Sequence, residues 1–189
     1  IIMIVSAFAA LVSSGGAPRA SIYMGKRDNQ SAEQILGNCF VLQIAVSFIL
    51  TAVLLIWSED ILLAFGASEN TISYAVDYMH IYAIGTLFVQ LTLGMNAFIT
   101  AQGFTTTSMV SVLIGAICNI TLDPIFIFGF HMGVKGAALA TVLSQAVSTI
   151  WVIFFLCGKK THLHLRKKYM RLEPKVFVPC VTLGLAAFI

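Results

Sequence analysis

Charged side chains are scarce in this chain of 189 residues. Asp, Glu, Lys and Arg together make up 10% of it, whereas hydrophobic residues make up 59%. A soluble domain with so few charges could not cover its surface with groups that water solvates, which excludes a soluble globular protein. We therefore expect the chain to fold in a lipid bilayer, with membrane lipid as a partner.

Cysteine and histidine are also scarce, with four residues of each. The cysteines lie far apart in or beside apolar stretches, which indicates small hydrophobic side chains rather than a disulfide framework. The histidines lack the third ligand that a metal site would need. The sequence therefore predicts no metal centre built from these residues and no cofactor.

Long uncharged stretches are the main feature that the sequence does contain. A helix needs about 20 apolar residues to cross a bilayer. Such stretches occupy residues 39–57, 81–101 and 136–157, and 104–130 carries a single charge. The chain also begins inside one hydrophobic run and ends inside another. We expect an all-α, polytopic membrane bundle of about six segments, and we interpret the sequence as a fragment cut at both ends.

The basic residues indicate which side of the membrane each loop faces, because short loops rich in Lys and Arg remain cytoplasmic. They fall in the loops at 25–37 and 158–175, with Arg19 just before the first of these, whereas the loop at 58–71 is acidic. If the first, third and fifth loops are cytoplasmic, Lys135 is the one basic residue outside. We interpret 158–175 as a solvated cytoplasmic loop, not as a nucleic-acid-binding patch.

Asp123 is the only charged residue of the stretch 104–130. A carboxylate at membrane depth costs roughly 2.5–3.5 kcal/mol on insertion scales, so its default interpretation is functional. Asn119 precedes it by four residues and therefore lies on the same helical face. Pro124 has no N–H to give the carbonyl of Ile120, so we expect a helix kink that frees this carbonyl as a further oxygen ligand.

The segment that follows carries a stripe of small residues that lets helix backbones approach closely: Gly133, Gly136, Ala137, Ala140, Thr141, Ser144 and Ser148. At a rise of about 1.5 Å per residue, Asp123 and Thr141 both lie about 7–9 Å inside the outer end. Asn119, Asp123 and Thr141 are therefore predicted to meet in one site. Their oxygens suit a hard cation such as Na⁺, and the carboxylate suits a proton equally well.

A purely structural role is the alternative for each of these polar residues. Asn119 and Asp123 could only join helices by hydrogen bonds, and the hydroxyl of Thr141 could bond to its own backbone. Four more polar residues inside helices are interpreted either as interhelical contacts or as cavity-lining groups: Gln43, Gln90, Asn96 and Gln145.

Two neighbouring stretches resemble the multidrug and toxic compound extrusion (MATE) family of transporters. They read Asn119-Ile-Thr-Leu-Asp123-Pro124-Ile-Phe-Ile-Phe-Gly129 and Met132-Gly133-Val-Lys-Gly136-Ala-Ala-Leu-Ala-Thr141-Val-Leu-Ser-Gln145. Weaker matches begin at Gly15 and Gly94, and the resemblance covers nearly the whole chain.

The resemblance implies a twelve-helix transporter of two six-helix lobes. This chain would hold helices two to six of the N-lobe in 1–157, a basic cytoplasmic inter-lobe loop in 158–175 and the start of helix seven in 176–189. Its partners would be the missing first helix and C-lobe of the same protein. The implied location is the cell membrane.

The implied function is secondary active export of drugs or organic cations by antiport with Na⁺ or H⁺. In some members an Asn and an Asp one turn apart on helix five and a Thr on helix six bind the cation or proton, and these positions match Asn119, Asp123 and Thr141. The same site uses an acidic residue of helix one, which lies outside this chain.

Two other membrane functions are alternatives to drug export. A lipid-linked saccharide exporter of a related superfamily should have a basic cavity, whereas the clear intramembrane charge here is acidic. A non-transporting scaffold would lose only stability when Asp123 is replaced. We expect no enzyme, because no second intramembrane acid or histidine is visible to pair with Asp123.

Overall fold

The computed structural model describes residues 2–66 and 71–186, and within these ranges the chain is built from helices without strands. The shorter elements are α3 (Ser58–Ala64), the 3₁₀ helix η2 (Lys167–Tyr169) and α7 (Pro174–Ala186). Five helical segments are long and apolar enough to cross a membrane: α1 (Ile2–Gly25), α2 (Asn29–Ile56), α4 (Ile72–Ala101), α5 (Thr105–Pro124) with its continuation η1 (Ile125–Gly129), and α6 (Val134–Cys157). The all-α, polytopic membrane fold expected from the sequence is confirmed.

Two helices begin earlier than hydropathy predicts. Helix α2 begins at Asn29, inside the expected loop 25–37, because Asp28 caps it by accepting hydrogen bonds from Ser31 N at 3.1 Å and Ser31 Oγ at 2.6 Å. Helix α7 begins at Pro174, where the fixed φ of proline suits the first helical position. Both starts are set by local capping chemistry, which a hydropathy profile does not register.

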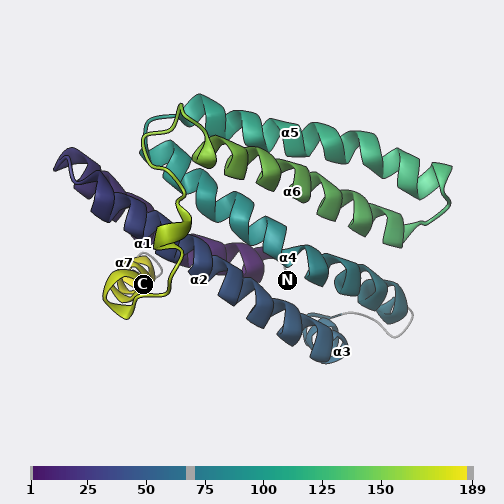
Figure 1. Cartoon of the computed structure of the whole chain (residues 1–189). Coiled ribbons are helices and arrows are strands. Elements are labelled where there is room, and N and C mark those ends of the chain that lie inside the picture. Colours follow the sequence, from purple (N-terminus) through teal and green to yellow (C-terminus); the bar gives the residue numbers. More distant parts are fainter. Residues whose placement is uncertain (1, 67–70, 187–189) are drawn as a thin grey trace.

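Helix α4 lies at the centre of the bundle and contacts α1, α2, α3, α5 and α6. Figure 1 shows α5 and α6 side by side along one edge of the molecule, with α4 between them and the α1–α2 pair. Helix α7 packs against α1 and α2 at the other edge. The α5–α6 pair is thus joined to the rest of the bundle through α4.

Small residues set the close approach of α6 to its neighbours. A methyl group on Gly115 of α5 would lie 2.5 Å from Ser148 Oγ, and one on Gly136 would lie 2.8 Å from the carbonyl oxygen of Phe126. Because lipid tails are as apolar as side chains, such close backbone packing, rather than hydrophobic burial, drives helix association in a membrane. The tight packing expected of the small-residue stripe is confirmed.

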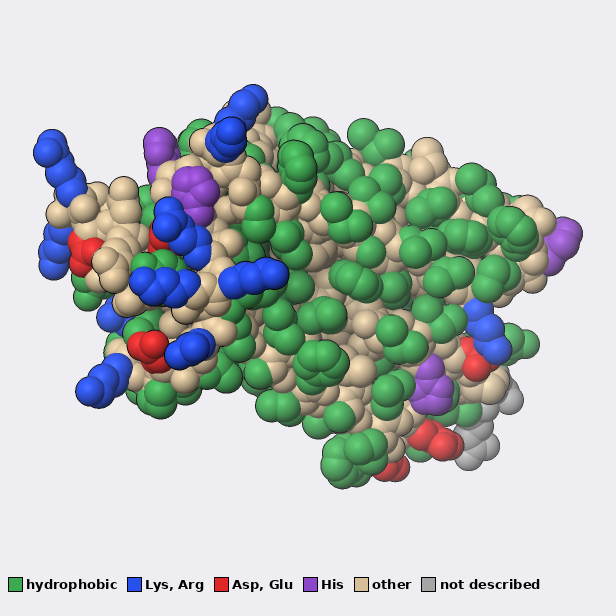
Figure 2. Space-filling model, viewed as in Figure 1, with side chains coloured by type: hydrophobic (Ala, Val, Ile, Leu, Met, Phe, Trp, Pro, Cys, Tyr) green, Lys and Arg blue, Asp and Glu red, His purple; other side chains and the backbone are tan. Residues whose placement is uncertain are grey.

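The two ends of the bundle differ in charge. Figure 2 shows Lys and Arg side chains gathered at one end, while hydrophobic side chains cover most of the face between the ends. At the opposite end, Lys135 forms a salt bridge of 3.2 Å with Asp77. The short helix α3 lies near this end, within the acidic loop 58–71.

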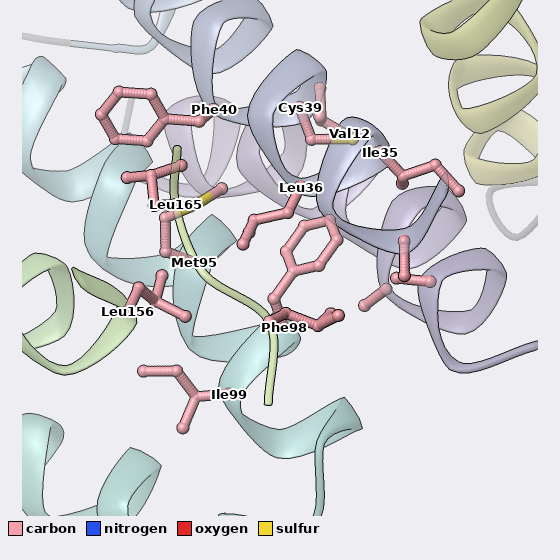
Figure 3. Packing of buried hydrophobic residues seen from close by; sticks show 14 of the residues in the cluster. Val12, Ile35, Leu36, Cys39, Phe40, Met95, Phe98, Ile99, Leu156 and Leu165 are labelled. Carbon is pink, nitrogen blue, oxygen red and sulfur yellow. The ribbon is translucent and has the colours of Figure 1, made fainter. Parts of the chain in front are cut away.

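The main hydrophobic cluster lies where α1, α2, α4 and α6 meet, towards the basic end of the bundle. Phe98, Met95 and Leu36 are completely buried in it. Figure 3 shows Leu165, from the segment after α6, among Phe40, Met95 and Leu156. A residue of the predicted solvated loop is therefore part of the core.

Candidate functional site

The intramembrane carboxylate lies near the outer end of α5. Asn119 Nδ2 donates a hydrogen bond to Asp123 Oδ1 at 3.4 Å, and both side chains are half-buried. Helical periodicity places the two groups on one face, as the sequence predicts. Among the residues that the structure describes, the second carboxylate oxygen accepts no hydrogen bond from the protein.

Pro124 ends the regular part of this helix. The backbone continues from Pro124 into the π-helical turn η1, in which Phe130 N donates to the carbonyl oxygen of Ile125 at 3.0 Å. The backbone thus changes from α to π geometry directly after Pro124, the position at which the sequence predicts a kink. π turns in membrane helices loosen the regular hydrogen-bond ladder and occur often at functional sites. Gly136 of α6 lets this turn approach, because its missing side chain leaves room for the backbone of Phe126.

A cavity of about 250 Å³, lined by both polar and apolar residues, lies between α4, α5 and α6 beside this pair. Asn119 of α5 and Thr141 of α6 both line it, whereas Asp123 lies outside its lining. No lining residue is charged. The lining residues are Thr92, Leu93, Asn96, Val112, Gly115, Ala116, Asn119, Thr141, Ser144, Gln145 and Ser148.

Thr141 uses its hydroxyl proton within its own helix. Its Oγ1 donates to the carbonyl oxygen of Ala137 at 3.0 Å, as the structural alternative anticipates. The oxygen keeps its lone pairs, so it can still accept a hydrogen bond or bind a cation. The cavity therefore contains acceptor oxygens from an amide and a hydroxyl next to the carboxylate of Asp123.

Hydrogen bonds beside the cavity connect the three helices that form it. Ser111 Oγ donates to Asn96 Oδ1 at 2.9 Å, and Ser148 Oγ donates to the carbonyl oxygen of Ser111 at 3.0 Å. The hydroxyl oxygens of Thr92 and Thr149 are 2.8 Å apart. These contacts join α4, α5 and α6 into one unit. Ser111, Thr92 and Thr149 were not predicted, although small hydroxyl residues at helical spacing in apolar helices are a signal for such contacts.

The four isolated polar residues divide into two groups. Asn96 and Gln145 line the cavity. Gln43 and Gln90 are completely buried outside it, where they donate to the carbonyl oxygens of Ala9 at 3.4 Å and Val5 at 2.9 Å. The structure thus places these two glutamines as interhelical contacts to α1 instead of in the cavity lining.

Comparison with known proteins identifies the class of this bundle. The family model described as MatE matches residues 1–125. The chain therefore belongs to the MatE family of membrane transporters, as the motifs around Asp123 predict.

The curated relatives are bacterial export proteins. The multidrug export protein MepA of Staphylococcus haemolyticus is 29% identical over 189 residues, covering 100% of this chain and 42% of the relative. MepA of Staphylococcus aureus (strain NCTC 8325 / PS 47) is 26% identical over 179 residues, covering 95% of this chain and 40% of the relative. The chain thus spans about two fifths of the length of the relatives it matches.

Solved structures of the same family share the fold. A multidrug resistance MATE family transporter of the MOP superfamily in an inward-facing conformation gives a TM-score of 0.89 at 23% identity, covering 96% of this chain and 41% of that chain. An outward-facing conformation gives a TM-score of 0.87 at 24% identity, covering 96% of this chain and 40% of that chain. At this level of identity the likeness establishes the fold of the bundle.

Proposed function

We propose that this chain is part of a multi-pass cell-membrane exporter that moves drugs or organic cations out of the cell by antiport with Na⁺ or H⁺. Membership of the MatE family and the export function of the MepA relatives support the activity. One observation supports the site: the Asn119–Asp123 pair adjoins an uncharged cavity that Asn119 and Thr141 both line.

The coupling step uses the carboxylate as the charged ligand. A Na⁺ ion bound at Asp123 would receive further oxygens from Asn119 and Thr141, and a proton would neutralise the same carboxylate. The bound ion favours one arrangement of the two lobes through its higher affinity for that arrangement, because only differential affinity can shift a conformational equilibrium.

The rest of the site comes from outside this chain. Helix α5 with η1 is the least buried of the five membrane-spanning segments, with 11% of its most apolar window covered. We assign its open face to the first helix of the full protein, whose acidic residue completes the site in some members of the family. The C-lobe supplies the opposite wall of the drug pathway.

The test measures ethidium efflux from cells that express the full-length protein at equal membrane abundance. Asp123→Asn keeps the shape of the side chain but removes its charge, and we expect it to abolish export. A requirement for Na⁺ in the wild type would identify the ion, while export that follows the proton gradient would identify H⁺. Export by Asp123→Asn at the wild-type rate would make Asp123 structural and contradict the proposed site.

A matched pair of threonine variants checks the position of the site. Thr121 and Thr141 both donate to a backbone carbonyl of their own helix, but Thr121 is exposed and does not line the cavity, whereas Thr141 lines it. We expect Thr141→Val to weaken ion-dependent export and Thr121→Val to leave it unchanged. Equal effects of both changes would show that membrane insertion, not the cavity, is being measured.

A further inference from the structure

We infer that residues 158–173, between α6 and α7, form a rigid strap that moves with helices α1–α6. The flexible joint to the next part of the protein then lies at or after Pro174, not at Gly158. The sequence predicts a solvated loop here because of its basic residues. This role goes beyond the proposed transport function and does not depend on which ion or drug is transported.

Gln102, the residue that follows α4, fastens the first part of the strap. Its Oε1 accepts three hydrogen bonds: from Thr161 Oγ1 at 2.7 Å, His162 N at 2.9 Å and Leu163 N at 2.8 Å. Two of these donors are backbone N–H groups that a loop in solution would give to water. One side chain thus fixes three successive residues.

Glu33 of α2 fastens the middle of the strap. Its Oε1 accepts from His164 N at 3.2 Å, and its Oε2 lies 3.1 Å from Arg166 Nε. The Glu33 side chain is only 8% exposed. A carboxylate so poorly solvated needs partners, because a buried charge without hydrogen bonds is costly. The strap provides those partners, so its release would leave Glu33 unpaired.

Apolar contacts also fix the middle of the strap to the bundle. Leu163 and Leu165 are 0% and 7% exposed, and both belong to the main hydrophobic cluster. Figure 3 shows Leu165 pointing into this cluster. Leu165 N also donates to the carbonyl oxygen of Leu156, the penultimate residue of α6, at 3.0 Å. Buried leucines thus alternate with exposed polar residues along the strap, as in an edge strand that covers a core.

The last part of the strap lies directly on α2. A methyl group on Gly37 would be 2.5 Å from the carbonyl oxygen of Tyr169, so only glycine allows this approach. Asn38 Oδ1 accepts a hydrogen bond from Glu173 N at 2.7 Å. The residue just before α7 is therefore fixed to α2. The joint cannot begin before Pro174 while these contacts hold.

The test uses the full-length protein in inside-out vesicles, which present the cytoplasmic face to trypsin. A protease must bind several residues in extended form, so it cuts a mobile loop quickly and a docked segment only when the segment opens. We expect slow cleavage of the wild-type strap and cleavage at least tenfold faster in Glu33→Ala and in Gln102→Ala. The strap offers six exposed cleavage sites: Lys159, Lys160, Arg166, Lys167, Lys168 and Arg171.

Glu173→Ala is the matched control, because Glu173 lies on the strap and its exposed side chain has no hydrogen bond or ion pair in the parts of the chain that the structure describes. Its cleavage rate should equal that of the wild type. Lys26 and Arg27 report on general unfolding from the other basic loop, and cleavage there should not change. Wild-type cleavage as fast as that of unfolded protein, or no acceleration in Glu33→Ala and Gln102→Ala, would overturn the strap.

Spin labels on two introduced cysteines, in a background where the exposed native Cys157 is replaced by Ser, give a second measurement that leaves the strap contacts intact. Labels at the exposed positions Gln30 on α2 and Lys168 on the strap should give one narrow distance distribution. The distribution should be the same at high and low pH and with or without Na⁺. A broad or shifted distribution would place the joint at Gly158 and contradict the inference. Neither measurement depends on transport. A failure of the strap inference can therefore be distinguished from a failure of the proposed transport function.

Discussion

The outer cavity and the cytoplasmic strap use similar polar side chains in opposite ways. Asn119, at the cavity, is half-buried, and its side chain makes a single hydrogen bond, of 3.4 Å, within the described part of the chain. Asn38, under the strap, is 2% exposed, donates to Gln34 at 2.9 Å and accepts from Glu173 at 2.7 Å. The Asn119 amide thus keeps bonding capacity for a ligand, whereas the buried Asn38 amide is held by partners on both its nitrogen and its oxygen.

Replacing Asn119, the amide at the cavity, should give the largest effect, and this effect should be on the transport rate. We expect Asn119→Ala to reduce ion-coupled export by at least tenfold, because a bound cation loses an oxygen ligand next to Asp123. The melting temperature in detergent should change little, since the bond lost is long and half-exposed. Dye efflux and thermal unfolding of the same preparations check both parts. A large fall in melting temperature with normal efflux would show that Asn119 has a structural role and does not bind the ion.

Replacing Asn38, the amide under the strap, should instead lower the stability of the folded protein. We expect Asn38→Ala to destabilise the protein by about 1–3 kcal/mol, because the buried Asn38 amide loses its hydrogen bonds to Gln34 and Glu173. Thermal unfolding measures the change, and Asn29→Ala, at an exposed position on the same helix, is the control. The apparent affinity for the coupling ion should not change. An altered ion affinity in Asn38→Ala would contradict the distinction between an ion-binding outer cavity and a purely structural cytoplasmic strap.

The smallest effect concerns the cap of α2. Hydrogen bonds from the Ser31 side chain and backbone lower the pKa of Asp28, so the carboxylate stabilises the folded state. This contribution is present above the unfolded pKa of about 3.9 and is lost as pH falls through the lowered folded pKa. Wild type and Asp28→Asn should therefore differ slightly in melting temperature at neutral pH and converge in strong acid. A difference that persists at low pH would mean that the charge of Asp28 plays no part.

Much of the fold follows from the sequence because membrane helices are constrained by length and charge. The apolar stretches predict the spans, and helical periodicity alone places Asn119 and Asp123 on one face. The sequence could not show that Gln145 lines the cavity while Gln90 contacts α1, because this depends on how each helix is rotated against its neighbours. That rotation is set by close contacts such as Gly115 with Ser148.

The sequence does not predict the strap, because its composition and its residue pattern favour different structures. Its basic residues are typical of a solvated loop, yet Leu163 and Leu165 alternate with His162 and His164. A period of two is typical of an extended segment with one buried face. The composition decided the interpretation, although the alternation was the better guide to burial.

The length of α4 has a consequence for the membrane itself. Its 30 residues span about 45 Å, whereas the hydrocarbon core of a bilayer is about 30 Å thick. The helix therefore tilts or extends into the headgroup layers, which lets Gln102 emerge far enough to hold the strap in the aqueous phase. Bilayer thickness then sets how deeply the strap lies among the lipid headgroups, so membranes of different acyl-chain length should change its exposure to water without any change in the protein.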